Sequence, residues 1–187
     1  MQQEIKKSIE VLQSGGMILY PTDTIWGIGC DATSEAAVTK IYHLKRRVEN
    51  KSMIILLDSA DKLNDYVEDV PELAWDLLKS VDTPLTIIYP KARNLASNVV
   101  ADDGSIAIRI VRHPFCTALI AAFGKPIVST SANISGSAPP RVFKEISPVI
   151  IQYIDHVVRL QQDDVQYVKP SRIIKLNTNG EFRIIRK

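Results

Sequence analysis

Apolar residues recur at helical spacing in several parts of the chain. Near the start, Ile5, Ile9 and Leu12 share one face of a predicted helix, which Gly15 and Gly16 would end. Proline or serine marks the expected beginning of other helices, because both residues favour the first positions of a helix. Further helices are expected to begin at or near Ser34, Leu63, Pro71, Pro114 and Arg141. Gly124 would end the helix that begins at Pro114, and the helix near Arg141 would reach Ile146.

Short apolar or alternating runs between these helices predict β-strands. In the run 105–110 three isoleucines alternate with Ser105, Ala107 and Arg109, so the two sets face opposite sides of a strand. Other strands are expected at 17–20, 25–30, 53–57, 85–89, 127–130, 156–160, 172–176 and 182–185. Because strands and helices interleave, the sequence predicts an α/β fold with a large mixed sheet. The last two strands form a hairpin around Asn179-Gly180, so the sheet is not purely parallel.

The composition indicates one domain, residues 1–187, that can bury a core without disulfides. A net charge of +2 excludes an acidic disordered chain and a histone-like polycation. No apolar run reaches the roughly 18 residues that a membrane span needs. The N-terminal segment lacks the apolar stretch of a signal peptide, so a cytoplasmic location is expected, with Cys30 and Cys116 as buried thiols.

The charge is unevenly distributed along the sequence. Residues 58–82 carry a net charge of −6, whereas 40–51 carry +4 and 169–187 carry +5. Such runs can be solvated faces, or the two basic segments can converge on one polyanion.

Common catalytic and nucleotide-binding signatures are missing. The chain has no P-loop, no dinucleotide fingerprint and no nucleophile elbow, and its three histidines lack metal-ligand spacing. What remains is a set of cations and hydroxyls at the ends of predicted elements. Lys45, Arg46 and Arg47, followed by Lys51, can complement the dipole at the end of the second helix or can clamp a phosphate.

Arg109 and two polar loops are the other candidates for chemistry. Arg109 rises beside Ala107 on a strand face of small residues, where it can hold a carboxylate or can lie on an exposed sheet face. The loops 22–24 and 129–133 follow short strands, where α/β sheets bind ligands, although these residue types are also ordinary turn formers. Trp26 is expected in the core or at the border of a pocket.

Five segments together resemble the YrdC-like threonylcarbamoyl-adenylate synthases of the single-domain type. They follow the order of that family and span nearly the whole chain. The segments are GGMILYPTDTIWG at 15–27, KRR at 45–47 with Lys51, SIAIR at 105–109, SANISG at 131–136 and KPSRII at 169–174.

The resemblance implies a fold and a reaction. The expected fold is a twisted mixed sheet with helices around a concave, positively charged cavity. Members join L-threonine, bicarbonate or CO2, and ATP into threonylcarbamoyl-adenylate and release pyrophosphate, and Mg²⁺ is expected with the triphosphate. Downstream tRNA threonylcarbamoyltransferase proteins then use the adenylate to modify adenosine beside the anticodon, which makes contact with RNA conceivable.

The resemblance also implies roles for individual residues, with no protein ligand named for the metal. Threonine would be held by Thr24, Arg109, Ser131 and Ser171, with Arg109 on its carboxylate. ATP or the adenylate would contact Lys45, Arg47, Lys51, Ser105, Asn133, Arg141 and Arg186. The set expected to be catalytic is Lys45, Arg47, Ser131 and Asn133.

The sequence departs from the family pattern at several positions, among them a P-G-P-like turn that is reduced to Thr83-Pro84. Val48 and Ser52 stand where prolines are frequent, and Leu56 stands where a histidine is frequent, which removes one polar contact to threonine. The alternatives are a double-stranded RNA or ribosomal RNA binding module on the same fold, a paralogue without efficient synthase activity, and an interaction protein with a vestigial cavity. The RNA-binding alternative fits less well with a net charge of only +2.

Overall fold

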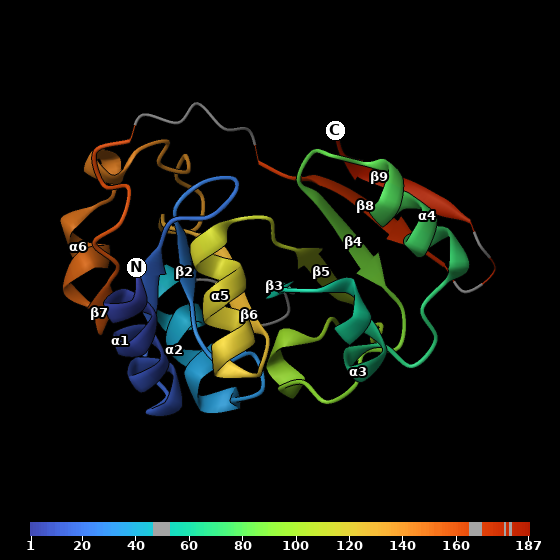
Figure 1. The fold of residues 1–187 in the computed structure, drawn as a ribbon, viewed down its shortest axis with the longest axis horizontal. Coiled ribbons are helices and arrows are strands. Elements are labelled where there is room, and N and C mark those ends of the chain that lie inside the picture. Colours follow the sequence, from blue (N-terminus) through green and yellow to red (C-terminus); the bar gives the residue numbers. More distant parts are fainter. Residues whose placement is uncertain (47–52, 165–169, 178, 180) are drawn as a thin grey trace.

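A computed structural model describes residues 1–46, 53–164, 170–177, 179 and 181–187. Its nine strands form one sheet in the order β7-β1-β2-β6-β3-β5-β4-β8-β9 (Figure 1). The strands are β1 (Ile18–Tyr20), β2 (Gly27–Gly29), β3 (Ile54–Leu57), β4 (Leu85–Tyr89), β5 (Ile106–Ile110), β6 (Ile127–Ser131), β7 (His156–Val157), β8 (Arg172–Leu176) and β9 (Phe182–Arg186).

The sheet is mixed, as the sequence predicts. β1 pairs with β7, β3 with β5, and β4 with β8 in parallel, whereas the other five neighbouring pairs are antiparallel. β6 lies between β2 and β3 and is antiparallel to both. It therefore joins the half of the sheet built on β1 and β2 to the half built on β3, β5 and β4.

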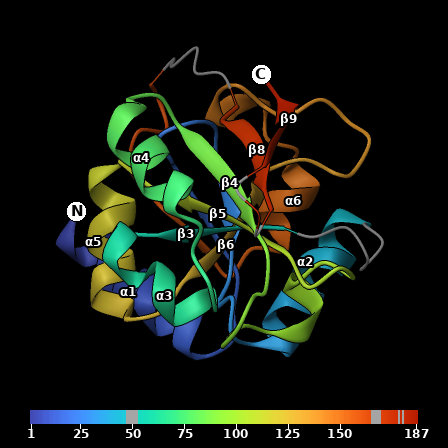
Figure 2. The ribbon, with the colours of Figure 1, turned by 90° about the vertical axis from the view of Figure 1, so that its right-hand side faces the viewer.

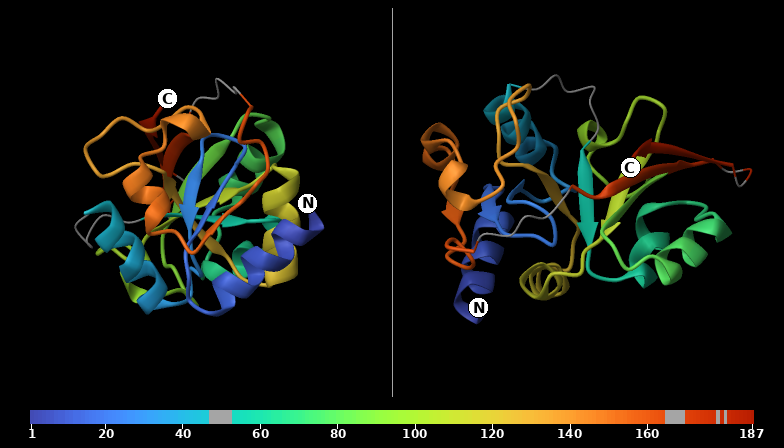
Figure 3. Two further views of the ribbon diagram at one scale, coloured as in Figure 1. Left: turned by 90° about the vertical axis from the view of Figure 1, so that its left-hand side faces the viewer. Right: turned by 90° about the horizontal axis from the view of Figure 1, so that it is seen from above.

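Helices cover both faces of the sheet. They are α1 (Gln2–Gln13), α2 (Glu35–Lys45), α3 (Leu63–Tyr66), α4 (Glu72–Ser80), α5 (Pro114–Phe123) and α6 (Pro148–Gln152). Figure 2 shows α1 and α5 on one side of the central strands and α2 and α6 on the other, and Figure 3 shows the same division from the opposite side. None of the helices in the described residues combines the length and the apolar character needed to cross a bilayer.

Side chains alternate between the two faces of the sheet, and the apolar side chains of each face belong to a separate hydrophobic core. Ile106 and Ile108 of β5 belong to the larger core, which also contains residues of α2 and α6. The smaller core packs α1 and α5 against Ile18, Tyr20 and Leu56. Ala107 and Arg109 face the side of the smaller core, so any space that α1 and α5 leave open on this face has an arginine beside it.

Two predicted helix ends are confirmed in detail. The Ser34 hydroxyl accepts a hydrogen bond from the backbone N–H of Ala37 at 3.3 Å, which caps α2. Gly124 ends α5 with a φ of 76°, a conformation that favours glycine.

Two local predictions are wrong. The helix expected at 141–146 is a single 3₁₀ turn, Phe143–Glu145, because Val142 and Ile146 on either side are extended. The next α-helix begins instead at Pro148, which suits the first helical turn. The strand expected at 156–160 is shortened to His156–Val157, the two residues that pair with β1.

Candidate functional site

A cavity of about 320 Å³ opens on the sheet face that carries Arg109. Its lining comes from β3, β5 and β6, from the loop before β2, and from the hairpin of β8 and β9. Arg109 and Arg186 are the charged side chains among its described lining residues. A cavity of this size that has cations and no acids in its lining suits a small anionic ligand.

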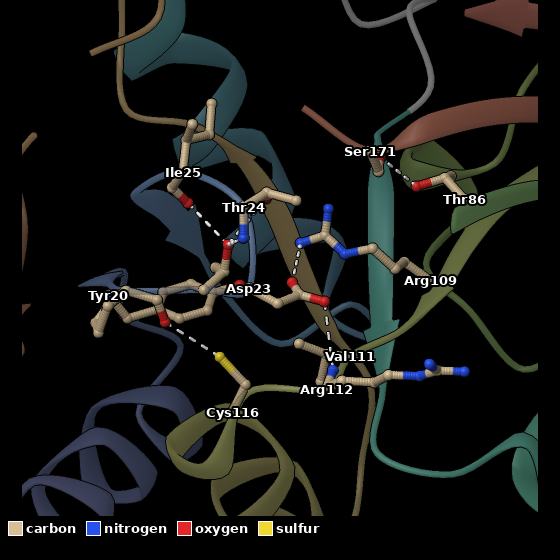
Figure 4. A network of polar contacts seen from close by, with 12 residues as sticks. Tyr20, Asp23, Thr24, Ile25, Thr86, Arg109, Val111, Arg112, Cys116 and Ser171 are labelled. Carbon is tan, nitrogen blue, oxygen red and sulfur yellow. Dashed lines mark hydrogen bonds and ion pairs between the residues drawn. The ribbon is translucent and has the colours of Figure 1, made fainter. Parts of the chain in front are cut away.

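Arg109 reaches into this cavity from β5 and is 4% exposed. Its Nη2 lies 3.2 Å from Oδ1 of Asp23, a charge contact that falls short of hydrogen-bond geometry (Figure 4). Its Nε is buried and has no hydrogen-bond partner among the described residues. Because an unpaired buried donor is costly, this N–H is a candidate partner for a bound carboxylate.

Asp23 is also fixed from its other side. The backbone N–H of Arg112 donates a hydrogen bond to Oδ2 at 3.3 Å, and the two oxygens thus face different groups (Figure 4). The Arg112 guanidinium points elsewhere, toward Asp82 and the carbonyl oxygen of Leu78.

Beneath the loop, the Cys116 thiol donates to the carbonyl oxygen of Pro21 at 3.2 Å. Burial first, and the negative charge of Asp23 second, raise the pKa of that thiol.

The loop between β1 and β2 brings Thr24 to the cavity. The Thr22 hydroxyl accepts from the backbone N–H of Thr24 at 3.0 Å and donates to the carbonyl oxygen of Ile25 at 2.8 Å. The two threonine hydroxyls are 3.0 Å apart. Thr24 is 6% exposed, so the turn holds a buried hydroxyl at the cavity wall.

Glycine at two positions of β2 makes room behind this loop. A Cβ on Gly29 would lie 2.6 Å from the carbonyl oxygen of Val128 and 2.7 Å from the Tyr20 ring. The ring therefore crosses the strand here and donates its hydroxyl to Val128 at 3.2 Å. Gly27 itself lines the cavity beside Ser129.

Ser171 and Arg186 form the opposite wall. Ser171 is 2% exposed, and its hydroxyl lies 2.8 Å from that of Thr86 on β4 (Figure 4). Arg186 donates from Nε to the carbonyl oxygen of Ser171 at 2.9 Å and from Nη2 to its hydroxyl at 3.3 Å. The pKa of Arg186 is lowered by partial loss of solvent and, second, by the positive charge of Arg109. Two cations thus share one small cavity.

The structure also brings three members of the expected catalytic set together. Lys45, at the end of α2, is 2% exposed, and its amine donates to the carbonyl oxygens of Ser131 at 2.5 Å and Asn133 at 2.6 Å. The Asn133 amide donates to the carbonyl oxygens of Ile134 and Ser137, while its Oδ1 accepts nothing from the described residues. Ser131 lines the cavity. Arg47 and Lys51 lie outside the described residues, as do Val48 and Ser52.

Two predicted ATP contacts lie away from the main cavity. The Ser105 hydroxyl is buried and donates to Asp103 at 2.5 Å. Arg141 borders a separate small cavity beside Thr24 and Trp26, and its backbone N–H donates to Glu145. Trp26 lines both cavities and packs against Phe143 with ring centroids 4.9 Å apart.

Sequence reasoning assigned no individual role to three polar residues of this region, Asp23, Thr86 and Asp103. Asp23 carried one signal, because a carboxylate three residues after a fully buried strand needs a partner. Thr86 carried another, since it is a hydroxyl within an apolar strand. Leu56, in place of the frequent histidine, is fully buried in the smaller core next to Arg109 in the register of β3 and β5.

No group of three or more His, Cys, Asp or Glu side chains that could hold a metal is found in the described residues. Both cysteines are buried and form no disulfide, and burial is the first cause that raises their thiol pKa values.

Comparison with protein families adds a decisive observation. The Sua5/YciO/YrdC family model, whose description reads "Telomere recombination", matches residues 10–187. The chain belongs to the Sua5/YciO/YrdC family. Two curated Xanthomonas proteins named threonylcarbamoyl-AMP synthase are 39% identical to it over 158 residues. For X. euvesicatoria pv. vesicatoria (strain 85-10) the match covers 83% of this chain and 84% of the relative, and for X. oryzae pv. oryzae (strain PXO99A) 82% and 84%.

Solved structures of the Sua5/YciO/YrdC family show the same fold. P. abyssi Sua5 complexed with L-threonine has a TM-score of 0.84 and 25% identity over 94% of this chain and 52% of that one. The chain thus spans about half the length of that relative. E. coli YciO has a TM-score of 0.86 and 23% identity over 100% of this chain and 90% of its own.

Proposed function

We propose that this protein is an L-threonylcarbamoyladenylate synthase. It would condense L-threonine, bicarbonate or CO2, and ATP to threonylcarbamoyl-AMP, with release of pyrophosphate. The observation that carries the proposal is the cavity in which Arg109 and Arg186 meet the buried hydroxyls of Thr24 and Ser171. It lies in a chain that is 39% identical to proteins named for this activity.

The cavity would hold threonine. Arg109 would receive the carboxylate, because its unpaired Nε and its position on a floor of small side chains suit a planar oxyanion. Thr24, Ser131 and Ser171 would surround the amino acid with hydroxyl groups. The P. abyssi relative has been solved with L-threonine, which supports this assignment.

The ATP site would extend from this cavity along the loop 131–136. Lys45, Arg47, Lys51, Ser105, Asn133, Arg141 and Arg186 are the proposed contacts. Lys45 would act there largely by fixing the loop, because its amine donates to the carbonyl oxygens of Ser131 and Asn133. Asn133 would use Oδ1, which accepts no hydrogen bond from the described residues. Ser105 would have to exchange its hydrogen bond to Asp103 for a contact with the nucleotide.

The reaction needs positioning more than a protein nucleophile. The threonine nitrogen takes up CO2 to form a carbamate and loses a proton. A carbamate oxygen then bonds to the α-phosphorus while the bond from that phosphorus to the pyrophosphate oxygen breaks. Because both reactants are anions, fixed cations and N–H donors are the main requirement. Mg²⁺ is expected as part of the MgATP substrate, where it would offset phosphate charge, and we assign it no protein ligand.

The site favours this function over RNA binding. Duplex RNA recognition needs cations spread over a long surface, whereas the two arginines described here face one small cavity. The same residues argue against a vestigial cavity, because burying the cation of Arg109 and several hydroxyls without a ligand has a free-energy cost. The adenylate would pass to tRNA threonylcarbamoyltransferase proteins in the cytoplasm. We also propose that residues 1–187 act as one domain.

Pyrophosphate release tests the proposal. The protein is incubated with MgATP, labelled bicarbonate and each amino acid in turn, and release should depend on L-threonine and yield labelled adenylate. The Asn133→Ala variant should lower the rate, whereas Asn179→Ala, in the distant hairpin turn, should not. Absence of threonine-dependent release would overturn the synthase assignment, and tight salt-dependent binding of duplex RNA without ATP would favour the alternative.

A further inference from the structure

Asp23 is a buried carboxylate that contacts two different elements. Its side chain is 10% exposed, and it lies between the guanidinium of Arg109 and the backbone N–H of Arg112 (Figure 4). The activity proposed above assigns no role to it. The burial of this carboxylate calls for an explanation, because burying a charge costs free energy unless the charge is paired.

We propose that Asp23 is a positioning residue for the amino-acid substrate, which it serves by holding the guanidinium of Arg109 in place. This inference rests on the proposed function, since Arg109 is there the partner of the threonine carboxylate. Asp23 itself does not touch the substrate in this scheme and acts through Arg109.

The surroundings of Arg109 explain why its head group needs an anchor. The neighbouring cavity residue on β5 is Ala107, which is too small to restrict a long side chain. Within the described part of the chain, Asp23 is the acid found within ion-pair distance of the guanidinium. With one edge of the guanidinium directed at Asp23, the unpaired Nε is left for a second carboxylate.

Asp23 can serve as an anchor because the backbone holds it. The Arg112 N–H that it accepts from lies just beyond the end of β5, the strand that also carries Arg109. The carboxylate therefore ties the loop between β1 and β2 to β5. Thr24 is the next residue of that loop, so the same contact sets the spacing between Thr24 and Arg109, two of the proposed threonine contacts.

The charge of Asp23 also influences how much negative charge the cavity favours in a ligand. Arg109 and Arg186 both face the cavity, and their mutual repulsion contributes to the lowered pKa of Arg186. Asp23 offsets one of these two charges from behind the wall. A cavity balanced in this way suits a ligand with one carboxylate, as an amino acid has.

The test compares Asp23→Asn with Asp82→Asn, which breaks an exposed pair made by the neighbouring Arg112. Replacing the carboxylate of Asp23 by an amide keeps the shape of the side chain and removes its charge. The KM for L-threonine should rise on the order of tenfold or more in Asp23→Asn, because one partner of a buried charge pair is lost. The KM for ATP and kcat should stay within about twofold, and Asp82→Asn should match the unmodified protein.

A double-mutant cycle separates positioning from a structural role. If Asp23 acts through Arg109, adding Asp23→Asn to Arg109→Ala should change threonine affinity by less than about twofold. Affinity is measured by calorimetric titration of L-threonine without ATP, and circular dichroism verifies that each variant is folded. If Asp23→Asn does not fold, Asp23→Glu decides, because it keeps the charge and moves it by one methylene. A higher threonine KM in that variant supports the inference.

Three results would overturn the inference. The first is a threonine KM for Asp23→Asn equal to that of the unmodified protein. The second is an Asp23→Asn variant in which kcat falls, and the KM values for L-threonine and ATP rise, all by the same factor. The third is a double variant in which the effects of Asp23→Asn and Arg109→Ala on threonine affinity multiply. Failure of the proposed function has a different signature, because the unmodified protein would then neither bind L-threonine nor release pyrophosphate with it.

Discussion

The two walls of the cavity use similar side chains on very different supports. One wall, which we call the inner wall, consists of Thr24 and Arg109, which are 6% and 4% exposed. The other, the outer wall, consists of Ser171 and Arg186, and Arg186 belongs to β9, a strand whose five residues are all exposed. Each wall thus pairs a buried hydroxyl with a guanidinium, but the guanidinium of the inner wall is buried whereas that of the outer wall is exposed.

The difference lies in what stands behind each arginine. Arg109 is backed by Asp23 and by the core that α1 and α5 complete. Arg186 contacts Ser171, and the hairpin that carries it lies at the edge of the sheet farthest from α1 and α6 (Figures 1 and 3). We infer that the inner wall fixes the orientation of a ligand, whereas the outer wall adds charge. The following predictions test this difference.

The largest effect is expected at Arg109. Arg109→Ala removes the proposed partner of the threonine carboxylate and should lower kcat/KM for L-threonine on the order of 100-fold. It also leaves Asp23 without its cation, so the free energy of unfolding should fall by roughly 1–3 kcal/mol. Steady-state kinetics with varied threonine and urea unfolding measure the two effects. Arg109→Lys is the control, because it keeps the charge and loses the planar fork.

A smaller effect is expected at Arg186. Arg186→Ala should raise the KM for L-threonine by about tenfold, because the charged hydrogen-bond donor to Ser171, a proposed threonine contact, is lost. The KM for ATP should rise as well, because Arg186 is itself a proposed ATP contact. The unfolding midpoint should hardly change, since the residue is exposed. Arg183→Ala on the same strand is the matched control and should leave the kinetics unchanged. If Arg186→Ala cost as much activity as Arg109→Ala, the two walls would be equivalent and the comparison would fail.

The smallest effect is expected at Asp103, whose carboxylate links the outer hairpin to the start of β5. It binds Lys175 at 2.5 Å and the Ser105 hydroxyl at 2.5 Å, and the Lys175 contact is the first of the causes that lower its pKa to about 2. Because the folded-state pKa lies below the usual value near 3.9, the contact stabilises the fold above about pH 4. This stabilisation is lost as the pH falls toward 2.

Asp103→Asn should therefore lower the free energy of unfolding at pH 7 by less than about 1 kcal/mol, since the pair is half exposed. Urea unfolding at pH 7 and pH 2.5 measures the loss. The difference in free energy of unfolding between the unmodified protein and Asp103→Asn should be smaller at the lower pH. Asp69→Asn, which breaks an exposed pair with Lys91 away from the cavity, is the control for general charge effects. If this difference in free energy of unfolding were the same at both pH values, the charge of the Asp103 carboxylate would not contribute to stability.

Strong local signals allowed much of the fold to be predicted from the sequence. β4 and α5 begin and end within a residue of the expected positions, because a bounded apolar run and a Pro–Gly pair mark their ends. The turn at Phe143–Glu145 could not be predicted, because three residues show no periodicity and its place depends on the contact of Phe143 with Trp26. Contacts between distant segments of this kind leave little trace in local sequence.

Part of the candidate site could also be predicted from local sequence patterns. Alternation along 105–110 predicted that Arg109 and Ala107 share a face, and both line the cavity. The same alternation placed Ser105 with them, yet its hydroxyl binds Asp103. Asp23 lies in a loop that the sequence singled out, but its own role could not be predicted, because it depends on the approach of this loop to the end of β5, 89 residues away in sequence. Side-chain pairing across the sheet is therefore the part that required the structure.

The position of the last strands has a consequence for biosynthesis. β7 pairs with β1, and β8 pairs with β4, so the C-terminal strands are built into both halves of the sheet. Pairings of such large sequence separation form slowly, and on the ribosome they must wait until the later strand has been translated. Ser171 and Arg186 are translated after Arg109, so the cavity is complete only once these later residues are available. A nascent chain that stops short of these residues carries Arg109 and lacks the outer wall, and such a fragment should not retain threonine.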